Sequence, residues 1–579
     1  MQLKLAFAVK IRIQVNYTIF IFYFKRTNTL SPMKQTLTCL FLASATLVAC
    51  NNNETSEVPA VDSVAMNAIS EENFVNTVKT LSSDEFLGRM PFTEGETKTI
   101  NYLKEQFESL GLQPGNGDSY FQEVPLVEIT SHPSETLTLS GENGSINLSL
   151  LDDFVMGSRH LEETIQVDDS ELIFAGFGIV APEYDWNDYE GLDVKGKTVV
   201  VMVNDPGYYD KKLFKGETMT YYGRWTYKFE EAARQGATGI LIIHDTGAAS
   251  YGWNVVRSGW SGPQMALESA DNGASLAQFE GWISAESAKQ MFALAGVDTD
   301  VIEQAKKPGF KAVNLGLSTS ATINNEVERS TSNNVIAKLE GSKRPDEVII
   351  YAGHWDHLGV GEPLEGDSIY NGAIDNATGI AAILEIAKAF TQASVPPERS
   401  ILFMGLTAEE QGLLGSEYYA TNPIYPLAKT VANINIDAMG AMGETKDITV
   451  IGLGQSEMDE YVENAAKLQD RKVEGDRNPS AGSFFRSDHF NFAKVGVPAI
   501  YAGGGSDYVD QSEEAQAKRE MFAGRYHTQK DEYDESYWQM GGIMNDIRLF
   551  FQVGYTLSME TTFPKWKEGS EFKEAGEKR

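Results

Sequence analysis

Between residues 326 and 560 the chain alternates between two patterns of apolar residues. Short runs are apolar at almost every position, as in strands that are buried on both faces of a sheet: DEVIIYAGH, RSILFMGLT, TVANINIDAMG, DITVIGLG and VPAIYAG. Between them, stretches such as 376–390 repeat apolar residues every three or four positions, which predicts a helix with a buried face made of Ile380, Ile383, Leu384, Ala387 and Phe390. The alternation predicts an α/β fold with a mixed, largely parallel sheet flanked by helices.

The residues before this region divide into two blocks of different texture. Residues 66–160 begin with two helical patterns, the first of which keeps apolar residues on one face from Phe74 to Leu81, and continue with short alternating strands. Residues 161–325 hold strands interrupted by Gly and Pro turns, together with a helix and a buried strand. This block is expected to be a smaller, β-rich inserted domain, and residues 561–579 a polar tail.

The first 50 residues are interpreted as a leader. From Met33 a lysine precedes a short apolar run that ends in small residues, which is typical of a secretory signal and too short for a membrane span. The ending LVAC resembles the processing box of bacterial lipoproteins. It implies a lipid on Cys50 that anchors the protein to a membrane on the periplasmic or cell-surface side. An ordinary signal with an incidental cysteine is the alternative. Residues 51–65 would be a polar tether, and residues 1–32 either precede the true start or lie near the membrane.

Charge and cysteine content narrow the function further. The 579-residue chain has a formal net charge of −34 and a pI near 4.6, so its surface repels phosphates and no nucleic-acid partner is expected. Its only two cysteines are Cys39, inside the signal, and Cys50. The mature domains are therefore expected to contain no disulfide, no thiolate metal ligand and no cysteine nucleophile.

Histidines and acids cluster where the predicted strands end. In an open α/β sheet ligands bind beyond the carboxyl ends of the strands. Each residue alone has an ordinary explanation, such as an N-cap or a solvated first helical turn. Together they offer imidazole and carboxylate donors, which suit zinc in a hydrolytic site. The residues are His354, Asp356, Asp375, Glu409, Glu410, Asp437 and His527.

Six segments resemble, in order, the signatures of metallopeptidase family twenty-eight: GHWDHLG, NGAIDNATGIAAILEIA, FMGLTAEEQGLLGS, NINIDAMG, RSDHFNF and YHTQKDEYD. LSSDEFLGR and YLKEQFESLGLQP are similar to the family's N-terminal part. The resemblance implies a zinc exopeptidase-like fold in which residues 66–160 and 326–560 form the peptidase domain. GKTVVVMVNDPG and AARQGATGILIIHD resemble the protease-associated domain, which would occupy residues 161–325, most simply as a spacer without chemistry.

The family resemblance also implies a site with two zinc ions. Carried over by position, His354 and Asp437 would bind one ion, Glu410 and His527 the other, and Asp375 both. Three ligand carboxylates and a bridging hydroxide would balance the charge of the two ions.

Further roles follow from the same resemblance. Asp356 would hydrogen-bond the imidazole of His354, and Glu409 would be the general base. Tyr526 is a candidate oxyanion donor, with ordinary packing as the alternative. The RSDH segment, residues 486–489, is expected to lie behind the ligands or to shape a loop, with no ligand role for His489. His357 has no assignment.

The expected function is a zinc-dependent exopeptidase, most simply an aminopeptidase that acts on peptides with a free N-terminus through a di-zinc-bound hydroxide. An acidic site suits the substrate's amine. A carboxypeptidase would need a positive cluster, for which Arg486 is the single nearby candidate. The alternatives are an enzyme like glutamate carboxypeptidase, one like the glutaminyl cyclases, and a non-catalytic surface binding protein. The presence of all five ligands and Glu409 disfavours the last.

Overall fold

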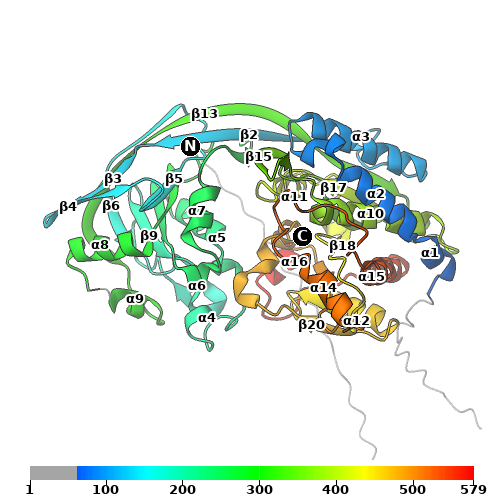
Figure 1. The fold of residues 1–579 in the computed structure, drawn as a ribbon. Helices are drawn as coiled ribbons and strands as arrows, with labels where there is room; N and C mark the ends of the chain where they lie inside the picture. Colours follow the sequence, from blue (N-terminus) through cyan, green and yellow to red (C-terminus); the bar gives the residue numbers. More distant parts are fainter. Residues whose placement is uncertain (1–60, 299) are drawn as a thin grey trace, which may run out of the picture. The chain divides into compact units, whose positions relative to one another are not determined.

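The computed structural model describes residues 61–298 and 300–579 (Figure 1). The leader and Cys50 lie outside these residues. The described chain begins with three helices, α1 (Ser63–Ala68), α2 (Glu71–Leu81) and α3 (Glu94–Ser109). Ser70 and Thr93 cap α2 and α3, because each side chain accepts a hydrogen bond from a backbone N–H of the first turn. A 3-10 helix, Asp84–Arg89, follows α2.

The main sheet has the order β13-β17-β14-β18-β21-β19-β20. β14, β17, β18 and β21 are parallel to their neighbours within this group, as are β19 and β20 to each other, whereas the β13–β17 and β19–β21 pairs are antiparallel. The predicted mixed, largely parallel sheet is therefore confirmed. The strand bounds are β13 Val313–Leu339, β14 Arg344–His354, β17 Arg399–Leu406, β18 Thr430–Asn435, β19 Asp447–Ile451, β20 Lys472–Gly475 and β21 Ala499–Gly503.

Helices cover both faces of this sheet, which explains why its strands are apolar throughout. Along β14, Ile349 and Tyr351 join one hydrophobic core with α10 (Thr378–Thr391), α12 (Met458–Lys467) and α15 (Gly541–Met559). Ile350 joins a second core with residues of α11 (Leu414–Thr421) and α13 (His489–Lys494). Successive side chains of a strand point to opposite faces, so both sets must be apolar. The five residues predicted to form the buried face of α10 are all buried.

A second group of strands lies in the middle of the chain. β6 (Thr164–Phe174), β9 (Thr198–Met202), β10 (Gly239–Ile243) and β12 (Phe279–Ile283) pair in parallel, with α5 (Trp225–Arg234) and α8 (Ala285–Ala295) in the same region. Strands from before residue 161 contribute to this core, since Leu139 and Phe154 pack in one cluster with Phe174. They are β3 (Thr136–Gly141), β4 (Gly144–Ser149) and β5 (Phe154–Gly157).

One long strand joins the two regions. β13 pairs with β17 of the main sheet at one end and with β6 of the second group at the other. Between them it runs antiparallel to β2 (Phe121–Pro133), and Figure 1 shows the two strands side by side along the top of the view. β13 continues without a break through residues 325 and 326, where the sequence suggested a junction. The division into domains stays a prediction.

The C-terminal segment is packed, although its composition suggested a polar tail. Trp566 and Phe572 are buried together with Phe484 and Phe490, and the chain ends in α16 (Lys573–Lys578). The indole of Trp566 donates a hydrogen bond to the carbonyl of Gly496 at 3.0 Å. These two buried aromatic side chains contribute to holding the segment against the fold. Within the described ranges, no helix combines the length and apolar character that crossing a bilayer requires.

Candidate metal centre

The predicted site residues meet at one edge of the main sheet. His354 is the last residue of β14, the Glu409–Glu410 pair follows the end of β17, and Asp437 follows the end of β18. These three strands are parallel, so their carboxyl ends lie side by side. Two loops complete the group: Asp375 precedes α10, and His527 follows α14 (Glu513–Glu520). All five predicted ligands are thus brought together.

Asp375 lies between the two predicted ligand histidines. Its Oδ1 is 3.1 Å from Nε2 of His354, and its Oδ2 is 3.1 Å from Nε2 of His527. On one side, Oδ1 of Asp437 is 3.2 Å from Nε2 of His354. On the other, Oε2 of Glu410 is 3.1 Å from Nε2 of His527. A carboxylate that presents one oxygen to each imidazole has the arrangement required of a ligand shared by two ions.

His357 is a member of this cluster that the sequence left unassigned. Its Nδ1 lies 2.5 Å from Oε1 of Glu410, and the side chain is fully buried. The second ring nitrogen, Nε2, has no hydrogen-bond partner within residues 61–298 and 300–579. His357 therefore holds the Glu410 carboxylate or competes with it for a metal ion. Its position three residues after His354, in the same strand-end segment, was the signal available in the sequence.

Asp356 supports the site in a different way from that implied by the family resemblance. Its backbone carbonyl is the group nearest to Nδ1 of His354, at 3.1 Å, whereas its carboxylate is 3.7 Å away. The carboxylate accepts hydrogen bonds from the backbone N–H groups of Glu409, at 3.1 Å, and Glu410, at 3.3 Å. Asp356 thus fixes the turn that separates the two adjacent acids, so that they face different parts of the site.

Two buried groups hold the loop that carries Asp375. The guanidinium of Arg89, which is 1% exposed, donates to the carbonyls of Leu81 (2.7 Å), Asn371 (2.6 Å), Trp355 (2.9 Å) and Gly372 (2.9 Å). From the other side, the carboxylate of Asp531 accepts from the backbone N–H groups of Ile374, at 2.9 Å, and Asp375, at 3.0 Å. Arg89 ends the LSSDEFLGR segment, and Asp531 lies in the YHTQKDEYD segment, but neither had an assigned role.

The RSDH segment lies behind Asp437. The hydroxyl of Ser487 donates to Oδ2 of Asp437 at 2.6 Å and accepts from the side-chain amide of Asn435 at 2.7 Å. His489 is buried, with ring centroids 4.6 Å from Phe484 and 5.1 Å from Tyr501, and neither of its ring nitrogens has a hydrogen-bond partner. Ser487 therefore orients the Asp437 carboxylate, while His489 packs among aromatic rings away from the ligand atoms.

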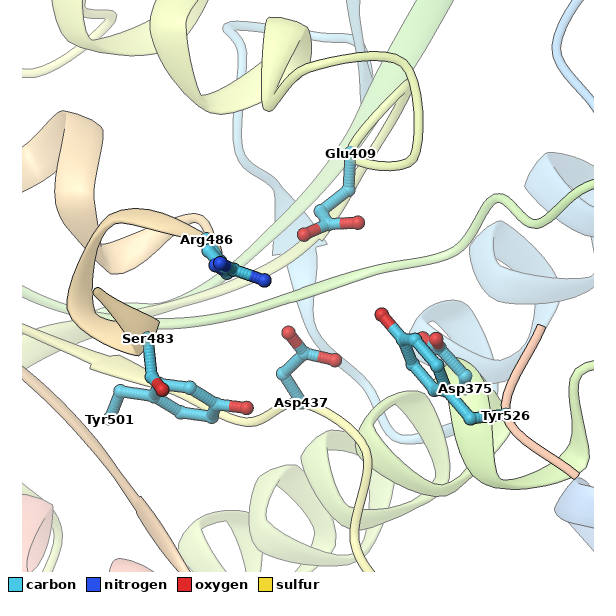
Figure 2. A pocket seen from close by; sticks show the side chains of 7 residues that line it. All are labelled: Asp375, Glu409, Asp437, Ser483, Arg486, Tyr501 and Tyr526. Atoms are coloured by element: carbon cyan, nitrogen blue, oxygen red, sulfur yellow. The ribbon is translucent and has the colours of Figure 1, made fainter. Parts of the chain in front are cut away.

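A cavity of about 170 Å³ opens onto the ligands (Figure 2). Tyr526 is 68% exposed at its rim and stacks on the ring of His527 at 3.8 Å between centroids. Ser483 and Tyr501 are wall residues that the sequence did not single out. Burial, together with nearby carboxylates, raises the pKa of the Tyr501 hydroxyl well above its usual value, so the group is a proton donor at neutral pH. The cavity is lined by Asp375, Glu409, Asp437, Ser483, Arg486, Tyr501 and Tyr526.

The electrostatics show that the site has an excess of negative charge. Burial lowers the pKa of His354, but the charges of Glu409 and Asp437 outweigh this effect and leave the pKa well above its usual value. Burial likewise lowers the pKa of His527, and its hydrogen bonds to Asp375 and Glu410 raise it to a net value of about 10. Burial raises the pKa of Glu409 well above the usual range. Divalent cations would neutralise such a cluster.

The donor atoms also fit metal ions by kind and spacing. The donor atoms of His354 and Asp437 lie within 4.8 Å of each other and of a carboxylate oxygen of Glu409, the expected general base. Those of His357, Asp375 and Glu410 form a second group by the same measure. Imidazole nitrogens and carboxylate oxygens are established zinc donors. The residues therefore fit two zinc ions, with Asp375 between them.

Comparison with known proteins identifies relatives of this region. Residues 334–551 match peptidase family M28. The chain is 33% identical over 138 residues to aminopeptidase NAALADL1 of Mus musculus, which covers 22% of this chain and 17% of that protein. It is 29% identical over 212 residues to leupeptin-inactivating enzyme 1 of Streptomyces exfoliatus, which covers 35% of this chain and 43% of that protein. The matches thus span less than half the length of these relatives.

Among solved structures, an aminopeptidase from Aneurinibacillus sp. strain AM-1 aligns with a TM-score of 0.49 at 20% identity, over 87% of this chain and 97% of that chain. The zinc aminopeptidase BSAP from Bacillus subtilis aligns with a TM-score of 0.40 at 19% identity, over 90% of this chain and 99% of that chain.

Proposed function

We propose that the protein is a zinc-dependent aminopeptidase that removes N-terminal residues from peptides, because residues 334–551 match peptidase family M28. The observation that carries the proposal is the convergence of two imidazoles on the two oxygens of Asp375, at 3.1 Å each. Glu409, which is not one of the five proposed ligands, lines the adjoining cavity. This separates a residue available for proton transfer from those that would hold the metal.

The proposed ligands divide between two ions. His354 and Asp437 would hold one zinc, Glu410 and His527 the other, and Asp375 both, with His357 behind Glu410. When bound, the ions would polarise the scissile carbonyl and lower the pKa of water. Every carboxylate in this set is positioned by other groups of the chain: Asp375 by Asp531, Asp437 by Ser487, and Glu410 by Asp356.

Glu409 is the proposed general base. Its Oε2 lies 3.8 Å from Nε2 of His354, at the wall of the cavity, and its backbone is fixed by Asp356. From this position its carboxylate takes a proton from the attacking water and returns it to the leaving amine. The hydroxyl of Tyr526, at the rim of the same cavity, is the proposed hydrogen-bond donor to the carbonyl oxygen in the transition state.

The carboxylates of the cavity also favour a substrate with a free amine, because a cationic N-terminus gains from the negative wall of Asp437 and Glu409. The experiment compares the zinc-loaded protein on matched peptides with a free and an acetylated N-terminus. Cleavage of the free form alone is expected, with release of the first residue detected by mass spectrometry. Equal cleavage of both forms would reject the aminopeptidase assignment.

For location, we propose that the protein is exported and anchored by a lipid on Cys50, as the LVAC sequence suggests. Mass spectrometry of the N-terminal peptide from membranes of the native host tests this directly. A lipid mass on Cys50, lost together with membrane association in Cys50→Ser, is expected. An unmodified Cys50 in mature protein would refute the proposal.

A further inference from the structure

Among the described residues, Arg486 is the one cation that lines the cavity. Figure 2 shows its guanidinium pointing into the space that Glu409 and Asp437 also face. One of its nitrogens, Nη2, donates to the carbonyl of Ala481 at 2.8 Å, and the side chain is otherwise exposed. Its guanidinium lies 5.9 Å from the ring centre of Tyr251, a residue of the 161–325 block. The cavity wall is thus adjacent to the block that was expected to be a spacer.

A second arginine, Arg224, belongs to the same block as Tyr251. Arg224 is half-buried immediately before α5, with its guanidinium 5.5 Å from the ring centre of Trp225. Burial, with a smaller contribution from the positive charge of Arg486, lowers the pKa of Arg224 to about 10. The hydroxyl of Tyr251 senses both arginines, because their charges oppose the rise that burial causes in its pKa. The positive charges of Arg224 and Arg486 therefore both act on Tyr251.

Neither arginine has an acidic partner. Across residues 61–298 and 300–579, no carboxylate oxygen lies within 4.0 Å of the guanidinium of Arg224 or Arg486. In a chain with 82 acidic and 48 basic residues, most arginines are expected to find a carboxylate. Two neighbouring cations without one repel each other, and this cost is recovered when an anion binds between or beside them. Guanidinium groups are suited to this because their fork of donors matches a carboxylate.

The carboxylates of the metal centre do not serve as that partner. Asp375 and Asp437 are committed to His354 and His527 and, in the proposed enzyme, to zinc. Once two divalent ions neutralise the ligands, Arg486 remains as unmatched positive charge in the cavity wall. Ser483 and Tyr501, in the same wall, add neutral hydroxyl donors. The wall opposite the metal ligands is therefore built to receive an anionic, hydrogen-bonding group.

We propose that Arg486, reinforced by the positive charge of Arg224, forms a carboxylate-binding subsite, so that the enzyme favours substrates with a carboxylate close to the scissile bond. The inference rests on the proposed aminopeptidase function and refines its substrate class. A carboxylate close to the scissile bond has two sources: the C-terminus of a dipeptide, or an acidic side chain at the N-terminal residue. In either case Arg486 is the specificity residue, and Arg224 of the 161–325 block adds positive charge to its surroundings.

The kinetic test compares two pairs of substrates that differ by one charge. Leucyl-glycine against leucyl-glycinamide measures the contribution of a C-terminal carboxylate. Glutamyl-glycinamide against glutaminyl-glycinamide measures that of an acidic side chain. We expect kcat/KM to be at least about tenfold higher for the charged member of one pair, and the pair identifies the source. Arg224→Gln and Arg486→Gln should each reduce this ratio toward one.

A matched control is Arg257→Gln, in the same block, because the guanidinium of Arg257 already faces Asp152 at 3.4 Å. This variant should keep the wild-type ratio. Zinc content and circular dichroism show whether each variant is folded, and the ratio of two substrates cancels any loss of active protein. A wild-type ratio near one in both pairs would overturn the subsite, as would an unchanged ratio in both Arg224→Gln and Arg486→Gln.

A binding experiment separates failure of the subsite from failure of the proposed function. Calorimetry on zinc-loaded Glu409→Gln compares leucyl-glycine with its amide, and glutamyl-glycinamide with glutaminyl-glycinamide, without turnover. If no peptide is cleaved by the wild type but the charged ligand still binds more tightly and loses this advantage in Arg486→Gln, the subsite stands and the aminopeptidase assignment fails. If peptides are cleaved but neither the rate nor the affinity depends on the charge, the aminopeptidase assignment stands and the subsite fails.

Discussion

Replacing Arg89 tests most directly how the loops that carry the proposed metal ligands are held in place. Its buried guanidinium joins the N-terminal segment to backbone carbonyls on both sides of the site: Trp355 next to His354, and Asn371 and Gly372 before Asp375. The change to examine is Arg89→Met, because methionine has a similar length and fills the space without a donor. Arg89→Lys keeps the charge but has fewer donors in a different geometry.

The magnitude follows from the contacts. Hydrogen bonds with a charged partner contribute about 1.5–3 kcal/mol each. Arg89 makes four of them at 2.6–2.9 Å. Such contributions are not additive within one network, so we expect Arg89→Met to lower the local free energy of opening by about 4 kcal/mol rather than by the full sum. Since 1.4 kcal/mol is tenfold, this corresponds to hydrogen exchange about 10³-fold faster in the affected loop.

The assay is hydrogen exchange followed by mass spectrometry on peptides that cover residues 371–377. β10, in the other core, is the internal control and should keep its protection. Arg89→Lys should fall between the wild type and Arg89→Met, and zinc affinity should decrease in the same order. Exchange of residues 371–377 that changes by less than threefold in Arg89→Met would refute the reasoning, because the carbonyls would then need no cationic donor.

Other parts of the site give further predictions. Glu409→Gln should reduce turnover by about 10²–10⁴-fold, while elemental analysis still finds nearly two zinc ions per chain. Asp375→Ala should lose zinc and activity together. Zinc that is retained in Asp375→Ala would contradict the role of Asp375 as a shared ligand. Ser487→Ala should weaken zinc binding about 10–100-fold in a chelator competition, because the 2.6 Å bond to Asp437 is lost, and unchanged affinity would exclude this support. Trp566→Ala should destabilise the fold by about 3–5 kcal/mol in denaturant unfolding, and Trp566→Phe by less; equal midpoints for all three proteins would mean that the C-terminal segment contributes no stability.

The main sheet and its site could be predicted from local sequence for a definite reason. The runs that became β14, β17 and β18 are apolar throughout because each strand faces a hydrophobic core on both sides. The acids and histidines that follow these runs meet because parallel strands end at one edge. A residue that directly follows one of these strands is therefore expected at this edge of the sheet, and this placement identified His354, Glu410 and Asp437 as candidates.

Other features depend on contacts between distant segments, which no local pattern encodes. The carboxylate of Asp356 accepts a hydrogen bond from the backbone N–H of Glu409 at 3.1 Å and lies farther, at 3.7 Å, from the imidazole of His354. The turn after β17 brings the backbone of Glu409 to this carboxylate in the folded protein. A boundary between two blocks was expected at residues 325 and 326, yet the alternating residues of β13 pair with strands on both sides. Trp566 reads as part of a polar tail until its partners Phe484 and Phe490 are brought to it.

By itself, the sequence determined the sheet, the helices that cover it and the chemical kind of the site, because buried strands and their ends have a strong local signature. Only the tertiary structure decided which cations lie beside that site. Arg224 and Arg486 are 262 positions apart and have no shared motif. Arg486 lies beside Tyr251 because the tertiary structure brings the middle of the chain next to the main sheet. Charge acts through distance in space, so the neighbourhood of a charged side chain is a property of the packed chain.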